Sequence, residues 1–149
     1  MTPVPRTRRR WLQDAAFIAL LFLLPLLMFA PQTVGGRTLL PAGNLYQYEP
    51  YASYRAEAGA PEVPHNHLLS DLVLQNMQWK AFTLESLRAG EIPLWNPHQF
   101  GGIPFLAAGQ QSALYPFSAL YYTLPLSAAY GWFTVLQLGL AGVFMYAYL

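Results

Sequence analysis

Asp71 is the residue of this chain whose neighbours best suit acid–base chemistry. His67 precedes it by four positions and Gln75 follows it by four, so on a helix the three polar side chains would share one face. A carboxylate in such a patch can take a proton from an incoming hydroxyl as a general base, or hold a divalent cation. A structural role is the alternative, because the helix dipole also stabilises a carboxylate in the first turn of a helix.

Two histidines, His65 and His67, lie close enough to Asp71 in the sequence to form a metal site with it. A divalent metal ion is therefore the cofactor that these residue types would admit. The alternative is that both imidazoles are ordinary residues of a proline-rich loop. His98, which follows Trp95-Asn96-Pro97, is a weaker candidate ligand.

The composition excludes several classes of protein. Of the 149 residues 54% are hydrophobic and only 10% are charged, against about 25% charged in an ordinary soluble domain. The formal charge of +1 provides no basic surface for nucleic acid, and the absence of cysteine excludes a thiolate nucleophile. The chain also has no phosphate-binding glycine motif, serine nucleophile elbow or H-E-x-x-H sequence, so we interpret Gly101-Gly102 as a tight turn.

Two apolar segments, 12–30 and 128–149, predict transmembrane helices. Four arginines within residues 1–11 precede the first, together with Trp11, which is typical of a cytoplasmic N-terminus with an interfacial anchor. Asp14 lies in the first turn of this helix, where we expect a structural role. A cleaved signal peptide is the alternative, although the apolar run is longer than usual and no small-residue cleavage site follows it.

The second apolar segment has tyrosine and tryptophan at both ends, as expected where a helix crosses the two membrane interfaces. Gly139 and Gly142 within it would permit close approach of another helix. The segment stops at Leu149 without a basic flank. We therefore expect the N-terminal piece of a longer polytopic protein, with a complete two-span protein as the alternative.

Residues 31–127 are expected to form an extracytoplasmic loop. Prolines and glycines interrupt its first part, and we expect its three glutamates, Glu49, Glu57 and Glu62, to be solvated. An amphipathic helix is predicted over about 69–89, capped by Ser70 and ended by Gly90. The predicted polar face carries His67, Asp71, Gln75, Gln78 and Glu85, and the predicted buried face carries Leu69, Val73, Met77, Leu84 and Leu87.

No charged residue follows Glu91, and tyrosines recur in the stretch that leads to the second apolar helix. This pattern predicts interfacial helices and turns over about 101–126. The predicted fold class is thus an all-α membrane protein. Two transmembrane helices would flank an extracytoplasmic loop that contains one amphipathic helix and short interfacial helices.

Several short motifs follow one another along residues 70–146. They are Ser70-Asp71-x-x-x-Gln75, Leu87-x-x-Gly90-x-x-Pro93-Leu94-Trp95-Asn96-Pro97, Gly101-Gly102-Ile103-Pro104, Leu114-Tyr115-Pro116-Phe117 and Leu138-x-x-Ala141-Gly142-x-x-Met145-Tyr146. Together they resemble the N-terminal part of the YfhO-type bacterial membrane proteins, which belong with the polytopic GT-C glycosyltransferases. The resemblance covers about residues 70–149, and the first helix matches by topology only.

The resemblance implies an integral protein of the bacterial plasma membrane that transfers a sugar on its outer face. The donor would be a polyprenyl-phosphate-linked sugar, and the acceptor a glycopolymer, lipid or protein of the cell envelope. Asp71 would serve as base or metal ligand and Gln75 would position it. The side chains expected to bind substrate are Gln78, Trp95, Asn96 and Tyr115.

The chain departs from the GT-C pattern in one respect, because no adjacent pair of acidic residues follows the first apolar segment. This departure weakens the expectation of a metal. The further spans that complete the site in the family are missing, so the segment alone is not expected to turn over substrate. The alternative function is a non-catalytic membrane protein that binds or guides lipid-linked saccharides, or scaffolds an envelope complex.

Overall fold

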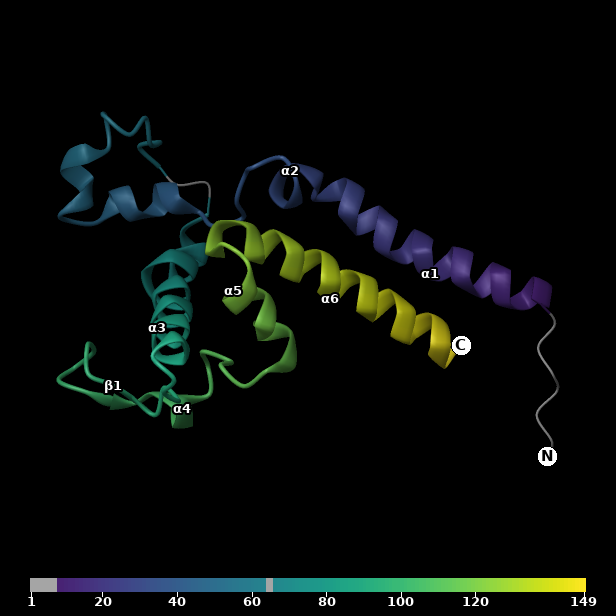
Figure 1. The fold of residues 1–149 in the computed structure, drawn as a ribbon. Coiled ribbons are helices and arrows are strands. Elements are labelled where there is room, and N and C mark those ends of the chain that lie inside the picture. The colour runs from purple at the N-terminus through teal and green to yellow at the C-terminus, as the bar shows by residue number, and fades with distance from the viewer. Residues whose placement is uncertain (1–7, 64–65) are drawn as a thin grey trace.

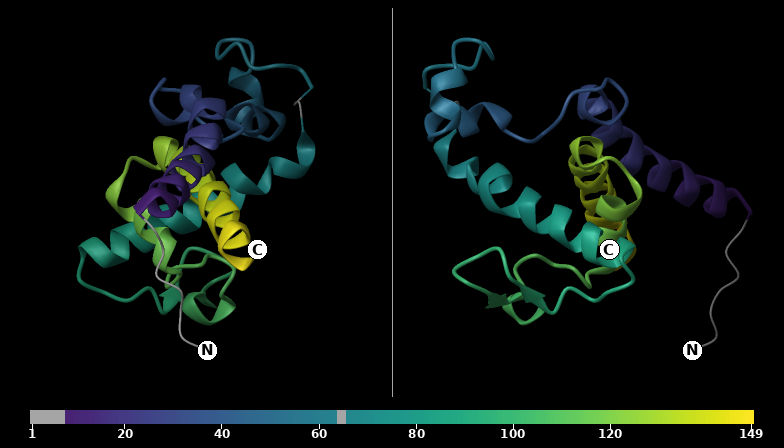
Figure 2. Two further views of the ribbon diagram at one scale, coloured as in Figure 1. Left: turned by 90° about the vertical axis from the view of Figure 1, so that its right-hand side faces the viewer. Right: turned by 60° about the vertical axis from the view of Figure 1, so that its left-hand side comes forward.

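The computed structural model describes residues 8–63 and 66–149, and this part of the chain is mostly helical (Figure 1). Its two long helices are α1 (Arg8–Met28) and α6 (Leu126–Tyr148). They lie side by side and run in opposite directions, and the elements between them gather around the end where α1 stops and α6 begins (Figures 1 and 2). The helical fold class is therefore confirmed in this coarse form.

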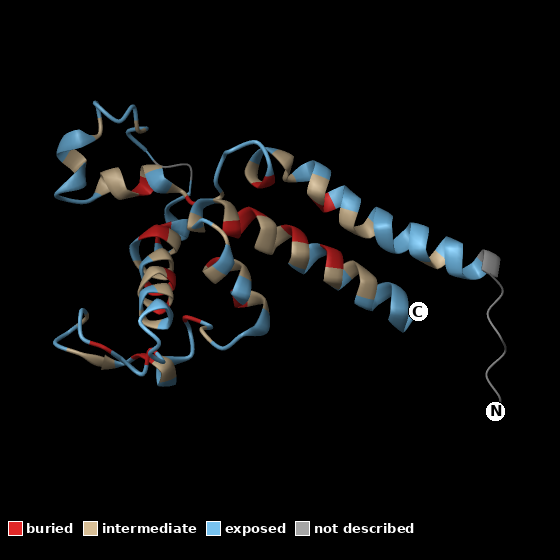
Figure 3. Ribbon diagram, viewed as in Figure 1, coloured by how far each residue is buried: buried red, intermediate tan, exposed pale blue. Residues whose placement is uncertain are grey.

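Both long helices are sufficiently long and apolar to cross a membrane, over Arg10–Met28 and Leu126–Tyr148. The apolar side chains of α1 remain exposed along most of its length, with Leu12 at 66% and Leu27 at 63% (Figure 3). Soluble monomers rarely expose a continuous apolar surface of this size. The exposure argues that α1 is not the core helix of a soluble domain.

Small residues allow α6 to approach α1 closely. A Cβ placed on Gly139 would clash with the ring of Phe22, and one on Gly142 would lie 3.0 Å from Cδ2 of Leu21. The expectation that these two glycines admit another helix is confirmed, and that helix is α1. The short helix α2 (Ala30–Thr33) follows α1 after a break, so α1 ends two residues earlier than expected.

The first part of the loop is irregular, as expected. It contains the 3-10 helices η1 (Ala42–Gln47), η2 (Tyr51–Tyr54) and η3 (His67–Leu69). Asn44 joins η1 to the start of the next helical segment, because its buried Nδ2 donates to Asn66 O at 2.9 Å and to Ser70 Oγ at 3.0 Å. All three glutamates of this region are exposed.

The amphipathic helix expected over about 69–89 is divided, which corrects that prediction. A π-helix, η4 (Leu72–Asn76), leads directly into the α-helix α3 (Met77–Arg88). Ser70 does not cap the segment. Its hydroxyl oxygen instead accepts a hydrogen bond from the side-chain amide of Asn44. Asn66 caps η3 instead, since its Oδ1 accepts the backbone N–H of Leu68 at 3.0 Å.

The predicted buried face is also wrong in part. Val73 is buried as expected, but Leu69 and Leu87 are exposed, whereas Lys80 and Thr83 are buried. The wider turn of the π-helix changes which side chains lie above one another, so a wheel drawn for a continuous α-helix loses its register. Hydrogen bonds then allow polar side chains to occupy the buried stripe.

The charge-free segment before α6 folds into short elements. They are β1 (Trp95–Asn96), β2 (Ile103–Pro104), α4 (Phe105–Ala108), η5 (Pro116–Ser118) and α5 (Ala119–Thr123). The short antiparallel β1–β2 ladder, with two residues in each strand, was not among the predicted elements. The turn expected at Gly101-Gly102 is present, because both residues have positive φ, at 77° and 121°.

A small core joins the loop to the start of α6. Tyr121 of α5 packs edge-on against Tyr130 of α6 at a centroid distance of 4.9 Å, and Val73 and Ala129 are buried beside them. The Tyr130 hydroxyl also donates to Oδ1 of Asn76 at 2.7 Å. The π-helix is therefore fixed to the first turns of the second apolar helix.

Candidate functional site

Asp71 lies immediately before the π-helix, and its side chain is exposed. Its carboxylate forms no hydrogen bond or ion pair with any residue that the structure describes, so it is free to receive a proton or a ligand. Gln75, within the same π-turn, is half-buried. Single π-turns are rare and occur frequently at functional sites. The bond between Asn76 and Tyr130 holds this turn beside the start of α6.

The β1–β2 hairpin is fastened to α3 through one amide. The Oε1 of Gln99 accepts the indole N–H of Trp79 at 3.0 Å and the Nδ2 of Asn96 at 3.3 Å. Asn96 is 3% exposed, and its own Oδ1 accepts the backbone N–H of His98 at 2.9 Å. The loop 97–99 is thereby held against the helix.

A pocket of about 360 Å³ lies between α3 and this loop. Its walls carry two predicted substrate-binding residues, Gln78 and Asn96, and three polar side chains that were not assigned to substrate. These three are Glu85, His98 and Gln99. Glu85 could have been found from the sequence because it lies on the predicted polar face of the helix, but nothing in the sequence pointed to Gln99.

The other predicted site residues do not line this pocket. Trp95 lines a separate pocket of about 380 Å³, together with Phe82 and Pro93. Tyr115 lines another of about 400 Å³, together with Leu106 and Gln111. Asp71 and Gln75 belong to the surface at the start of the helical segment. The structure thus distributes the predicted site over several surfaces, and the individual roles remain predictions.

Lys80 is a buried cation that the sequence interpretation missed. It is 3% exposed, and its Nζ donates to Gln111 O at 2.6 Å and to Ser118 Oγ at 3.4 Å. The Nζ also lies 4.7 Å from the centre of the Tyr121 ring. No carboxylate in the described part of the chain pairs with it. Burial lowers the pKa of Lys80 to about 8.

The predicted metal ligands are not assembled by the residues that can be placed. His65 lies outside the described residues, and His67 is exposed. Within residues 8–63 and 66–149, no group of three or more His, Asp or Glu side chains is arranged to hold a metal ion. Whether Asp71 serves as an acid–base residue or as a metal ligand therefore stays a prediction.

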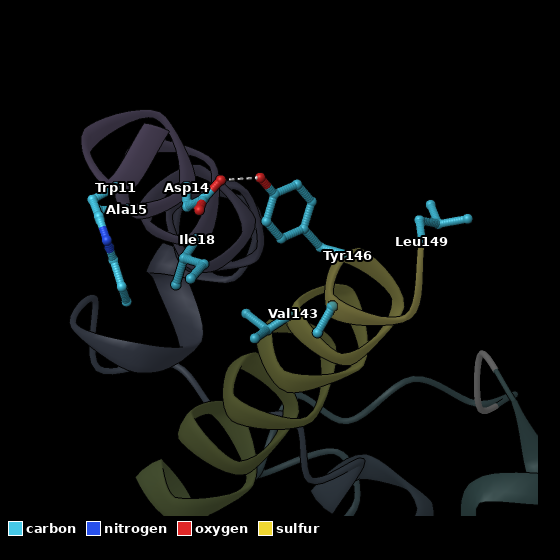
Figure 4. Close-up of a pocket in the computed structure, with 8 residues that line it drawn as sticks. Trp11, Asp14, Ala15, Ile18, Val143, Tyr146 and Leu149 are labelled. Atoms are coloured by element: carbon cyan, nitrogen blue, oxygen red, sulfur yellow. Dashed lines mark hydrogen bonds between the residues drawn. The ribbon is translucent and has the colours of Figure 1, made fainter. Parts of the chain in front are cut away.

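A larger pocket, of about 640 Å³, lies between the other ends of the two long helices (Figure 4). Its lining is mainly apolar and includes Trp11, Ile18 and Val143. Asp14 is also in this pocket, and its Oδ1 accepts a hydrogen bond from the hydroxyl of Tyr146. This contact accords with the structural role expected for Asp14.

Comparisons of the chain with models of protein families, with curated proteins and with solved structures found no match.

Proposed function

We propose that this chain is the N-terminal segment of an integral membrane glycosyltransferase with Asp71 as its general base. The enzyme would transfer a sugar from a polyprenyl-phosphate donor to a cell-envelope acceptor on the outer face of a bacterial plasma membrane. One observation carries the proposal. The exposed Asp71 carboxylate has no partner among the described residues, and it precedes a π-turn that Asn76 ties to α6.

Two further features support a membrane setting. The long apolar helices are antiparallel, so a pair of spans would keep the segment between them on one side of the bilayer. The arginines that precede the first helix favour a cytoplasmic N-terminus. On this topology Asp71 lies outside the cell, close to the start of the second span, where a lipid-linked donor presents its sugar.

The chemistry needs only one acid–base group from this segment. The Asp71 carboxylate accepts the proton of the acceptor hydroxyl as the acceptor oxygen forms its bond to the anomeric carbon. The bond between that carbon and the donor oxygen breaks, and the polyprenyl phosphate leaves with the bonding electron pair. Because the phosphate is a good leaving group, the reaction requires no nucleotide-binding fold.

The test is sugar transfer in membranes that contain the complete protein, supplied with a polyprenyl-phosphate sugar. Asp71→Asn keeps the size of the side chain but removes the base, so transfer is expected to fall by about 100-fold or more. Glu62→Gln is the matched control, since Glu62 is exposed and lies outside the helical segment that follows the proposed base. Equal expression with unchanged transfer in Asp71→Asn would overturn the assignment.

A non-catalytic protein that binds lipid-linked saccharides is the second candidate. The observation that favours it is the pocket between α3 and the loop 97–99. This pocket is lined by amides and one carboxylate, and Asp71 does not line it. Absence of transfer from both the wild type and Asp71→Asn, together with retained saccharide binding, would support this candidate.

A further inference from the structure

We propose that the pocket between α3 and the β1–β2 hairpin binds a neutral saccharide. Its lining includes Gln78, Phe82, Glu85, Asn96, His98 and Gln99. Assigning this saccharide as the acceptor in sugar transfer rests on the proposed function. The binding itself does not, because it follows from the chemistry of the pocket and can be measured without transfer.

The amide of Gln99 has a fixed orientation. An indole N–H can only donate, so the atom that accepts from Trp79 must be the Gln99 oxygen. Asn96 donates to the same oxygen, which leaves the Gln99 Nε2 without an acceptor in the described part of the chain. A ligand hydroxyl would supply that acceptor. Gln99 is thus a preset donor at the pocket wall.

Gln78 and Glu85 supply the opposite, helical wall. Both side chains are exposed, and neither has a hydrogen-bond partner among the residues described. The amide of Gln78 can donate and accept, and the carboxylate of Glu85 can accept from one or two hydroxyl groups. Donors and acceptors on facing walls match vicinal hydroxyls, since each hydroxyl both donates and accepts.

An aromatic corner completes the pocket. The rings of Phe82 and His98 meet at 82°, with their centres 5.8 Å apart, and Phe105 holds Phe82 from another side at 5.0 Å. Ring surface beside a few convergent polar groups is the usual composition of a small-molecule site. A pyranose fits this composition because it combines an apolar C–H face with a polar edge.

Charge and size narrow the ligand class. Glu85 is the only Asp, Glu, Lys or Arg among the residues that line the pocket, so phosphates and uronic acids are disfavoured by repulsion. A polyprenyl phosphate is disfavoured for the same reason, so the acceptor is the sugar that this pocket suits better. The volume of about 360 Å³ lies near the lower end of the range for ligand pockets. The site therefore suits one or two sugar units.

Binding can be tested by saturation-transfer-difference NMR with the 149-residue chain in lipid nanodiscs. The probes are the neutral disaccharides lactose, maltose and diacetylchitobiose, with glucose 1-phosphate and glucuronic acid as anionic counterparts. We expect saturation transfer to at least one neutral disaccharide and much weaker transfer to both anions. Binding of the anions alone, or of no neutral probe, would overturn the proposal.

Two variants assign the binding to this pocket. Gln78→Ala removes one hydrogen-bonding side chain, and Glu85→Gln replaces a charged acceptor by a neutral amide, so each should weaken neutral saccharide binding by about five- to tenfold. The matched controls are Gln110→Ala and Glu62→Gln, which are exposed and do not line the pocket. Affinities that remain unchanged in both pocket variants would refute the site.

The two proposals fail independently. Asp71→Asn should keep saccharide binding while it abolishes transfer. Loss of the pocket signal with a retained effect of Asp71 on transfer would overturn the saccharide site only. Saccharide binding without transfer by the complete protein would overturn the glycosyltransferase and keep the site.

Discussion

Tyr146 donates a hydrogen bond of 2.7 Å to Oδ1 of Asp14, which joins α6 to α1 across 132 positions of the sequence (Figure 4). The bond lies at the ends of the two long helices that are farthest from the loop. It gives the one carboxylate of α1 a donor at the place where the helix enters its apolar part. Asp14 is accordingly placed where it links the two helices, as the structural role predicted for it requires.

Removal of this donor should weaken the helix pair modestly. For Tyr146→Phe we expect the free energy of unfolding to fall by about 0.6 kcal/mol, the average measured for side-chain hydrogen bonds within membranes. Denaturant titration of the chain in detergent micelles measures this change. Tyr148→Phe is the matched control, because Tyr148 is 86% exposed and should leave stability unchanged. A loss of equal size in both variants would contradict a specific role for Tyr146.

The glycines of α6 predict a graded packing effect. Gly139→Ala places a methyl group against the rigid ring of Phe22, and we expect it to cost about 1–3 kcal/mol by overpacking. Gly142→Ala should cost less, because the nearest atom to its Cβ is a terminal methyl of the flexible Leu21 side chain, at 3.0 Å. The same titration in micelles ranks the two variants. Equal stabilities of Gly139→Ala and Gly142→Ala would contradict the close packing of α6 against Phe22 of α1.

Lys80 predicts a rise of stability with pH. Burial lowers its pKa to about 8, whereas the unfolded chain keeps the proton up to about pH 10.5. Between these values the unfolded state binds more protons, so the free energy of unfolding should increase by at most about 1.4 kcal/mol per pH unit. Lys80→Met should abolish this slope, as measured by denaturant titration at a series of pH values.

The measurement should stop near pH 10. Burial raises the pKa of Tyr121 and of Tyr122, so both remain protonated in the folded chain while unfolded tyrosines lose their protons. Above pH 10 these groups therefore lower the stability and oppose the effect of Lys80. A rising slope that persists in Lys80→Met would assign the titration to another group.

The long helices could be predicted from the sequence because their signal is local. An uninterrupted apolar run and its aromatic flanks locate both ends of α6 and the C-terminal end of α1 within about two residues, whereas α1 begins four residues before the predicted start. The divided helix could not be predicted, because its hydrogen bonds depend on distant partners. Ser70 resembles an N-cap in the sequence, yet Asn44 occupies its hydroxyl. Lys80 resembles a surface residue, yet Gln111 and Ser118 receive its ammonium group.

The residues of the candidate site also fall into those that could be predicted from the sequence and those that could not. The polar pattern of the predicted helix indicated Asp71 and Gln78, and both side chains are exposed in the structure. Gln99 could not be found from the sequence, because its role depends on the pairing of β1 with β2 and on contact with Trp79. A wheel projection shows which residues share a face, but it does not show which loop covers that face.

The membrane topology gives a further prediction, and the absence of native cysteine makes it simple to test. Ala58→Cys, in the exposed loop, should react with an impermeant maleimide in intact bacterial cells that express the chain. Leu149→Cys, at the opposite end of the long helices, should react only after the cells are permeabilised. Labelling of Leu149→Cys in intact cells would contradict the orientation. If α1 were instead a cleaved signal peptide, an N-terminal tag would be released while Ala58→Cys still reacted. Retention of the tag therefore distinguishes a transmembrane helix from a signal peptide.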